Sequence, residues 1–120
     1  MLVVDDQTPF RLAARMVIKR TPGFEVIGEA TSGEDSITMA QELRPDLVLM
    51  DINMGAMSGI EATREIVAGA PQTLVFLCST YNREDLPPGA LDTGAAAYLN
   101  KEELGPAVLS DLWSKWEPTR

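Results

Sequence analysis

The sequence contains no histidine and only one cysteine, Cys78. These scarcities argue against a zinc site, which draws its ligands mainly from those two residue types. Cys78 has no disulfide partner within the chain, so we expect an inert buried thiol and a reducing, cytoplasmic setting. No apolar run approaches the roughly 20 residues of a membrane span, and the N-terminus opens on a strand-like segment rather than on a signal peptide.

Positive charge is also scarce. The chain has 10 lysines and arginines against 18 aspartates and glutamates, a formal net charge of -8. Such a chain would repel a phosphate backbone, which makes this segment by itself a poor nucleic-acid binder. Carboxylates gathered in one place suit a hard divalent cation better. With 120 residues, 45% of them hydrophobic, the sequence predicts a single globular domain.

Short apolar runs alternate with amphipathic stretches of helical length from one end of the chain to the other. We predict five strands, at Met1 to Val4, Phe24 to Ala30, Leu47 to Met50, Thr73 to Cys78 and Ala95 to Leu99. Strands and helices that alternate in this way are typical of an α/β domain whose parallel sheet is covered on both faces.

Capping residues mark where the helices between these strands begin. Thr8 before Pro9 is expected to cap the first helix, Ser32 the second, and Ser58, with Glu61 three residues later, the third. The segment NREDLPPGALDTG occupies the place of a fourth helix, but its prolines and glycine favour one that is short, late or mobile. A last helix is predicted from about Glu102 or Pro106 to Trp116.

Polar residues gather where the predicted strands end. They are Asp5 and Asp6, then Asp51, then Ser79 and Thr80, and finally Asn100 and Lys101. Ligands of open parallel sheets bind at the carboxyl ends of the strands, so this edge is the expected site. Three carboxylates in one crevice would repel each other unless a cation were present, and Mg²⁺ fits oxygen ligands. Lys101 could pair with a carboxylate or hold a phosphoryl oxygen.

Four segments in order, LVVDDQ, LVLMDINM, VFLCST and AAAYLNK, resemble the signature segments of the receiver domain of bacterial two-component response regulators. The resemblance covers essentially the whole chain. It extends to the subgroup in which a helix-turn-helix DNA-binding domain follows. It implies one receiver domain over residues 1–120, with an effector domain expected beyond Arg120. The implied fold is flavodoxin-like (CheY-like): a doubly wound sheet of five parallel strands in the order 2-1-3-4-5, in three α/β/α layers.

The same resemblance implies roles for individual residues. Asp51 would accept a phosphoryl group from a sensor histidine kinase. Mg²⁺ would be held by Asp5, Asp6, Asp51 and the backbone carbonyl of Asn53. Lys101 would pair with the phosphoryl group, Ser79 would turn to hydrogen-bond it, and Tyr98 would swing inward as the switch. The implied outputs are transcriptional regulation through the attached domain and a homodimer formed by the fourth helix, fifth strand and last helix. DNA would be contacted only by the effector domain, and no membrane is involved.

Other interpretations of these residues remain open. Taken singly, each could be an ordinary loop, cap, turn or core residue, and a receiver that works without phosphate would show much the same sequence. An aspartyl-phosphate phosphatase is a weaker alternative, because Asn53 stands where such enzymes carry a second aspartate. A flavodoxin-like nucleotide-binding module is weaker still, because DDQTP lacks a glycine-rich phosphate loop. Gly55, where the family usually has proline, and Thr80, where a smaller residue is common, predict altered switching kinetics.

Overall fold

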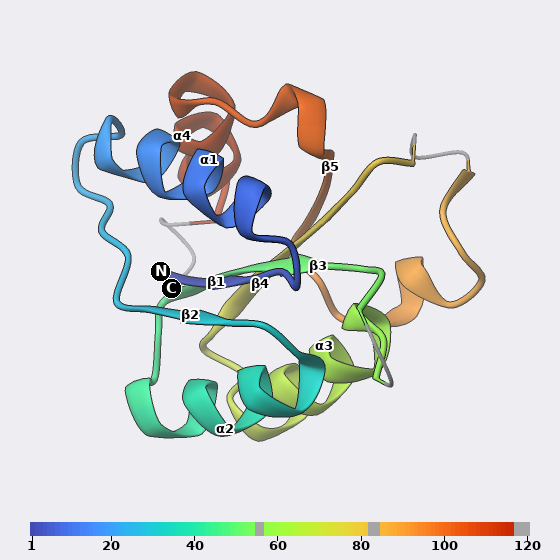
Figure 1. The fold of residues 1–120 in the computed structure, drawn as a ribbon. Coiled ribbons are helices and arrows are strands. Elements are labelled where there is room, and N and C mark those ends of the chain that lie inside the picture. Colours follow the sequence, from blue (N-terminus) through green and yellow to red (C-terminus); the bar gives the residue numbers. More distant parts are fainter. Residues whose placement is uncertain (55–56, 82–84, 117–120) are drawn as a thin grey trace.

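The computed structural model describes residues 1–54, 57–81 and 85–116 of the chain. Its elements are β1 (Leu2–Val4), α1 (Thr8–Lys19), β2 (Gly28–Ala30), α2 (Gly33–Leu43), β3 (Leu47–Asp51), α3 (Gly59–Gly69), β4 (Leu74–Ser79), η2 (Ala90–Asp92), β5 (Ala97–Asn100), η3 (Lys101–Glu103) and α4 (Pro106–Ser114). The strands form one 5-stranded parallel sheet in the order β2-β1-β3-β4-β5 (Figure 1). The predicted fold class and strand order are therefore confirmed.

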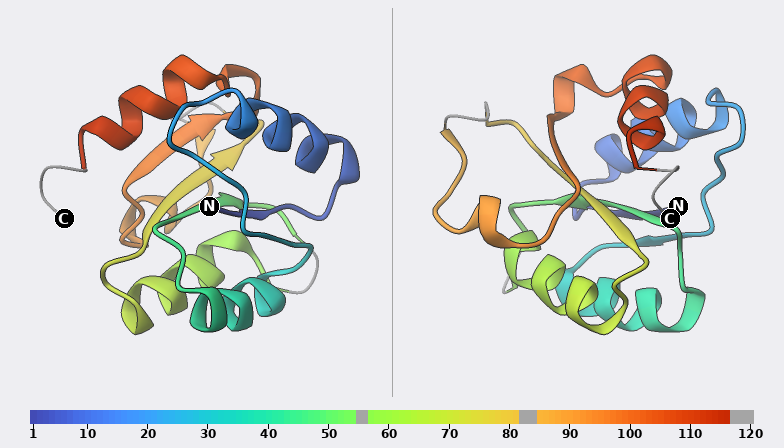
Figure 2. Two further views of the ribbon diagram at one scale, coloured as in Figure 1. Left: turned by 90° about the vertical axis from the view of Figure 1, so that its left-hand side faces the viewer. Right: turned by 180° about the vertical axis from the view of Figure 1, so that it is seen from behind.

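Two helical layers enclose the sheet. Figures 1 and 2 show α1 and α4 together on one face, and α2 and α3 together on the other. Alternation along the strands explains the two cores, because successive side chains point to opposite faces. In β1, Leu2 and Val4 pack into the core on the α2 and α3 side, whereas Val3 packs into the core beneath α1 and α4. Within the described part of the chain, no helix is long and apolar enough to span a bilayer.

The edge strand β2 is shorter than the sequence predicts. Its apolar run begins at Phe24, yet only residues 28–30 form the strand. Its sole neighbour is β1, in the register Leu2↔Gly28 to Val4↔Ala30, so the strand cannot extend far beyond that partner. The run before it instead packs on the α1 side, where the Phe24 and Trp113 rings meet edge to face.

Two of the three predicted helix caps are correct. The side chains of Ser32 and Ser58 accept hydrogen bonds from the backbone N–H groups of Asp35 and Glu61. The assignment of Thr8 is wrong, because the helix begins one residue earlier than that choice allows. Gln7 is the N-cap of α1, it makes no side-chain cap hydrogen bond, and Thr8 is already helical.

In the described part of this segment the fourth helix is short and late, as its prolines predicted: it is the single turn η2, preceded by Gly89 with φ of 86°. The last helix is divided. A single turn, η3, precedes Gly105, and α4 then runs to Ser114, so Trp116 lies beyond its end and is 37% exposed. Gly55, which was predicted to alter the switching kinetics, lies outside the described residues.

Candidate functional site

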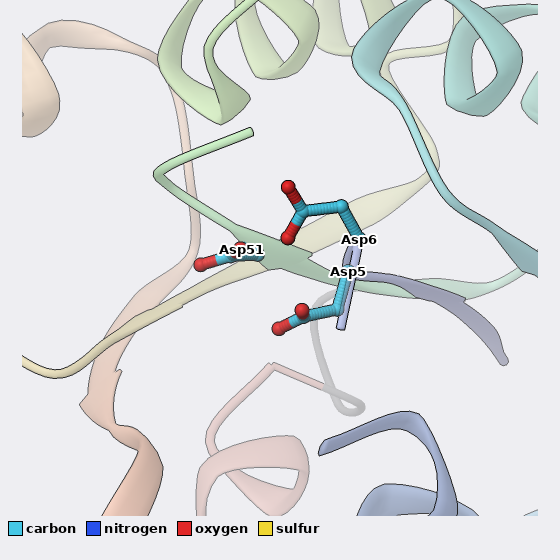
Figure 3. A group of neighbouring side chains, drawn as sticks. All are labelled: Asp5, Asp6 and Asp51. Atoms are coloured by element: carbon cyan, nitrogen blue, oxygen red, sulfur yellow. The ribbon is translucent and has the colours of Figure 1, made fainter. Parts of the chain in front are cut away.

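Three carboxylates meet at the carboxyl edge of the sheet. Asp5 and Asp6 follow β1, and Asp51 is the last residue of the adjacent strand β3. One carboxylate oxygen from each lies within 4.8 Å of the others (Figure 3). Asp5 and Asp51 are buried, whereas Asp6 is exposed. The strand-end argument therefore placed all three correctly, and they face one crevice.

Backbone contacts fix the position of Asp51. Its Oδ1 accepts a hydrogen bond of 3.4 Å from the backbone N–H of Asn53, which begins the turn out of the strand. Gly59, the first residue of α3, donates its N–H to the Ile52 carbonyl at 2.8 Å. A Cβ atom at Gly59 would overlap the Asp51 carbonyl oxygen, so the helix can start this close to the strand only with glycine there.

Lys101 bridges two of the carboxylates from the opposite side of the crevice. Its Nζ lies 2.7 Å from Asp5 Oδ2 and 3.3 Å from Asp51 Oδ1, and its side chain is only 14% exposed. Phe10 lies in the first turn of α1, and the centroid of its ring is 4.6 Å from the same ammonium. A capping box between Asn100 and Glu103 sets the turn that Lys101 begins.

The charges of the site perturb each other. Burial, and then the charge of Asp5, raise the pKa of Asp51 from 3.8 to about 6, although Lys101 opposes this. Burial lowers the pKa of Lys101, but its hydrogen bond to Asp5 and the charge of Asp51 outweigh burial, so its pKa lies above the ordinary value. One ammonium therefore does not fully compensate the carboxylates, and a further cation would stabilise the ionised form of Asp51.

The donor set fits Mg²⁺. The ion prefers oxygen ligands, keeps several waters and needs few protein carboxylates. Here the crevice offers three carboxylates that converge from two neighbouring strands, and the partly exposed edge at Asp6 leaves room for water. Asn53, whose backbone carbonyl was predicted as a further ligand, is exposed and lies two residues after Asp51.

The remaining predicted residues are less directly connected. Ser79 is buried at the end of β4, the strand that pairs with β3, and it follows Cys78, the partner of Asp51 in the register. Within the described residues, the Ser79 hydroxyl hydrogen-bonds only to the backbone of Tyr81. Tyr98 is half-buried in β5 and packs against the core on the α2 side. Thr80 is exposed, and its carbonyl accepts a hydrogen bond from Asn100. Cys78 is buried as expected, and burial raises the pKa of its thiol to about 12.

Three site neighbours escaped the sequence analysis: Phe10, Arg11 and Glu29. Arg11 donates from Nη1 to the Asp5 carbonyl at 2.7 Å and faces Glu29 of β2 at 3.4 Å. A signal for Arg11 was present, since helical spacing puts it on the face of Ala14 and Ile18, where a charged side chain needs a partner. Glu29 gave no such signal, because charged side chains are common on edge strands and do not by themselves indicate a partner.

A family model described as the response regulator receiver domain matches residues 1–111. Transcriptional regulatory protein DegU of Brevibacillus brevis is 34% identical over 102 residues, which are 85% of this chain and 43% of that protein. The protein-glutamate methylesterase/protein-glutamine glutaminase of Alkalilimnicola ehrlichii is 43% identical over 101 residues, 83% of this chain and 26% of that protein. The chain thus spans less than half the length of either relative.

Solved structures agree with the sequence matches. A two-component response regulator of the LuxR family from Aurantimonas sp. SI85-9A1 superposes with a TM-score of 0.86 at 28% identity, over 99% of this chain and 84% of that one. The superposition covers nearly the whole chain, so the fold is shared with that regulator.

Proposed function

The chain belongs to the response regulator receiver domain family, and from that premise we propose that Asp51 accepts a phosphoryl group from a histidine kinase in a Mg²⁺-dependent reaction. One observation carries the assignment of the site. Lys101 Nζ contacts both Asp5 and Asp51, at 2.7 Å and 3.3 Å, in a crevice that also receives Asp6. The acceptor carboxylate, the acidic group that would hold a metal ion and a fixed cation therefore lie together.

The reaction exchanges one bond for another. A carboxylate oxygen of Asp51 attacks phosphorus, a P–O bond forms, and the P–N bond to the donor imidazole breaks with its electron pair left on nitrogen. A carboxylate is a weak nucleophile, so positioning and charge neutralisation must supply most of the rate. Asp5, Asp6, Asp51 and the Asn53 carbonyl would hold Mg²⁺, which when bound neutralises phosphoryl charge. Lys101 pairs with a phosphoryl oxygen after exchanging its contact with Asp51.

The acyl phosphate supplies the signal. It adds negative charge and strong acceptor oxygens at the end of β3. We propose that Ser79 exchanges its hydrogen bonds with the Tyr81 backbone for one to the phosphoryl group, and that Tyr98 then turns inward. Ser79 is buried beside the site and Tyr98 is half-buried, so a small shift of the first would open space for the second.

The longer protein would act as a transcriptional regulator, as the name of the relative DegU suggests for that protein. In this proposal residues 1–120 are one receiver domain, a DNA-binding effector makes the contact with DNA, and the receiver pairs with a second copy through the face of η2, β5 and α4. The chain catalyses no reaction besides its own phosphorylation and dephosphorylation. A cytoplasmic location and a sensor histidine kinase as partner accord with the family.

The test is incubation of the protein with Mg²⁺ and acetyl phosphate, followed by intact mass measurement. The proposal predicts an adduct of one phosphoryl group, absent from the variant Asp51→Asn and absent when a chelator removes Mg²⁺. No adduct on the unmodified protein would favour a receiver that works without phosphate. Sustained hydrolysis of phosphate esters would instead identify a phosphatase, and either result would overturn the proposal.

A further inference from the structure

We propose that Arg11 is a positioning residue for the metal-binding carboxylates, and that Glu29 of the edge strand holds Arg11 in place. The inference rests on the proposed function, because it concerns the Mg²⁺ that Asp5 and Asp6 would bind. Arg11 lies in the first turn of α1 and acts through the turn between β1 and α1.

The guanidinium of Arg11 contacts both ends of that turn. Nη1 donates to the Asp5 carbonyl at 2.7 Å, and Nη2 donates to the Thr8 hydroxyl at 3.1 Å. Asp5 starts the turn and Thr8 starts the helix, so one planar group spans the segment that carries both carboxylates. The side chain of Arg11 is 16% exposed, which strengthens these charge-assisted hydrogen bonds relative to ones in open solvent.

The turn has few other restraints. Helix α1 lacks a side-chain cap hydrogen bond at Gln7, and it has no acidic residue in its first turn. Besides Arg11, the restraints among the described residues include the Asp5 N–H, which donates to the Ala30 carbonyl at 3.1 Å, and Asp5 Oδ1, which accepts from the Gln7 N–H at 2.8 Å. Lys101 Nζ holds the other carboxylate oxygen of Asp5, Oδ2, at 2.7 Å. Asp6 is exposed, so the direction of its carboxylate depends on how firmly the backbone around it is held.

Glu29 orients the arginine from the neighbouring strand. Its carboxylate lies 3.4 Å from Arg11 Nε and 2.7 Å from Arg15 Nη2, so it is shared between two successive turns of α1. The Nε contact leaves Nη1 and Nη2 of Arg11 pointing along the helix to Asp5 and Thr8. The planar guanidinium of Arg11 makes all three contacts at once, to Glu29, the Asp5 carbonyl and the Thr8 hydroxyl. A lysine ammonium could not replace it, because it lacks this fixed geometry of donors.

This arrangement has the form of an outer shell around a metal site. Groups that orient metal ligands without touching the ion typically change metal affinity by about 10-fold to 100-fold when removed. Loss of Arg11 should therefore weaken Mg²⁺ binding by about 10-fold, with a smaller effect on folding. Arg15 offers a matched control, since it lies on the same helix and also pairs with Glu29, and among the described residues its side-chain contacts run to Glu29 rather than to the turn.

The test is calorimetric titration of Mg²⁺ into the unmodified chain and the variants Arg11→Ala, Arg11→Lys, Glu29→Gln and Arg15→Ala, with the fold of each checked by circular dichroism. We expect the dissociation constant to rise about 10-fold in both Arg11 variants, by an intermediate factor in Glu29→Gln, and by less than about twofold in Arg15→Ala. Arg11→Lys keeps the charge and the apolar stem, so it serves where Arg11→Ala fails to fold.

Folded Arg11 variants that bind Mg²⁺ as tightly as the unmodified chain would overturn the inference and leave the proposed function standing. Equal weakening in Arg11→Ala and Arg15→Ala would also overturn it, because the hydrogen bonds of Arg11 to the turn would then not be the cause. An unmodified chain that binds no Mg²⁺ and accepts no phosphoryl group would instead refute the proposed function, and the inference with it.

Discussion

Replacing Asp51 by asparagine should stabilise the fold in Mg²⁺-free buffer, although it removes the proposed acceptor. Burial and the charge of Asp5 raise the pKa of Asp51 from 3.8 to about 6, so the ionised carboxylate opposes folding. The difference corresponds to at most about 3 kcal/mol of unfolding free energy. The side chain is 5% exposed, which supports a gain of about 1 to 3 kcal/mol for Asp51→Asn at neutral pH.

The pH dependence follows from the direction of that pKa difference. The penalty is fully present above about pH 6, where Asp51 is ionised in the folded and the unfolded chain, and it fades as the pH falls toward 3.8. The stabilisation by Asp51→Asn, measured by urea unfolding, should therefore be largest near about pH 8 and fall to about half near about pH 5. Added Mg²⁺ should narrow the difference by stabilising the unmodified chain.

A matched control is Asp111→Asn, which neutralises an exposed aspartate on α4 far along the chain from the site. Its effect should stay within about 0.5 kcal/mol across the same pH range. The reasoning would be refuted if Asp51→Asn were less stable than the unmodified chain near about pH 8, or if its advantage grew on acidification.

Three further predictions concern other parts of the site. Gly59→Ala should lower the free energy of unfolding, measured in urea, by about 1 to 3 kcal/mol and should slow phosphorylation, because its Cβ would overlap the Asp51 carbonyl oxygen. Gly69→Ala, in the same helix with open space around it, should lower the free energy of unfolding by less, and an equal decrease in both variants would contradict the close approach. Phe10→Leu should slow phosphorylation several-fold without preventing it, since the ring contact with Lys101 contributes about 0.5 to 2 kcal/mol; an unchanged rate would show that the ring does not position the ammonium. Mg²⁺ should raise the melting temperature in a saturable way that Asp6→Asn weakens, and a rise equal in that variant would place the ion elsewhere.

Much of the site could be predicted from the sequence because strand ends are predictable in a parallel sheet. Apolar runs buried on both faces identified β3 and β4, and the polar residues that end each strand must then share one edge. That logic predicted that Asp5, Asp51 and Lys101 share one edge of the sheet, where the structure brings the Lys101 ammonium into contact with both carboxylates. The resemblance to a family then assigned a role to each, which the sheet alone could not do.

What the sequence could not provide depends on contacts between distant segments. The length of β2 depends on β1, its only partner, and the apolar run from Phe24 gives no sign of that limit. The start of α1 at Thr8 differs from the predicted cap by one residue, a shift that capping preferences do not resolve. The contact of Arg11 with Glu29 joins a helix to an edge strand, and although helical spacing marks Arg11 as a residue that needs a partner, it does not say that the partner is Glu29.

The most direct test of the account locates the phosphoryl group. The protein is phosphorylated with acetyl phosphate and Mg²⁺, the acyl phosphate is reduced with borohydride to leave homoserine, and the digested peptides are sequenced by mass spectrometry. The account predicts conversion at Asp51 alone, in the peptide that carries the end of β3, and none when Lys101 is replaced by methionine or Mg²⁺ is removed. Conversion at Asp5 or Asp6, or a stable phosphoryl group on a hydroxyl residue, would contradict it.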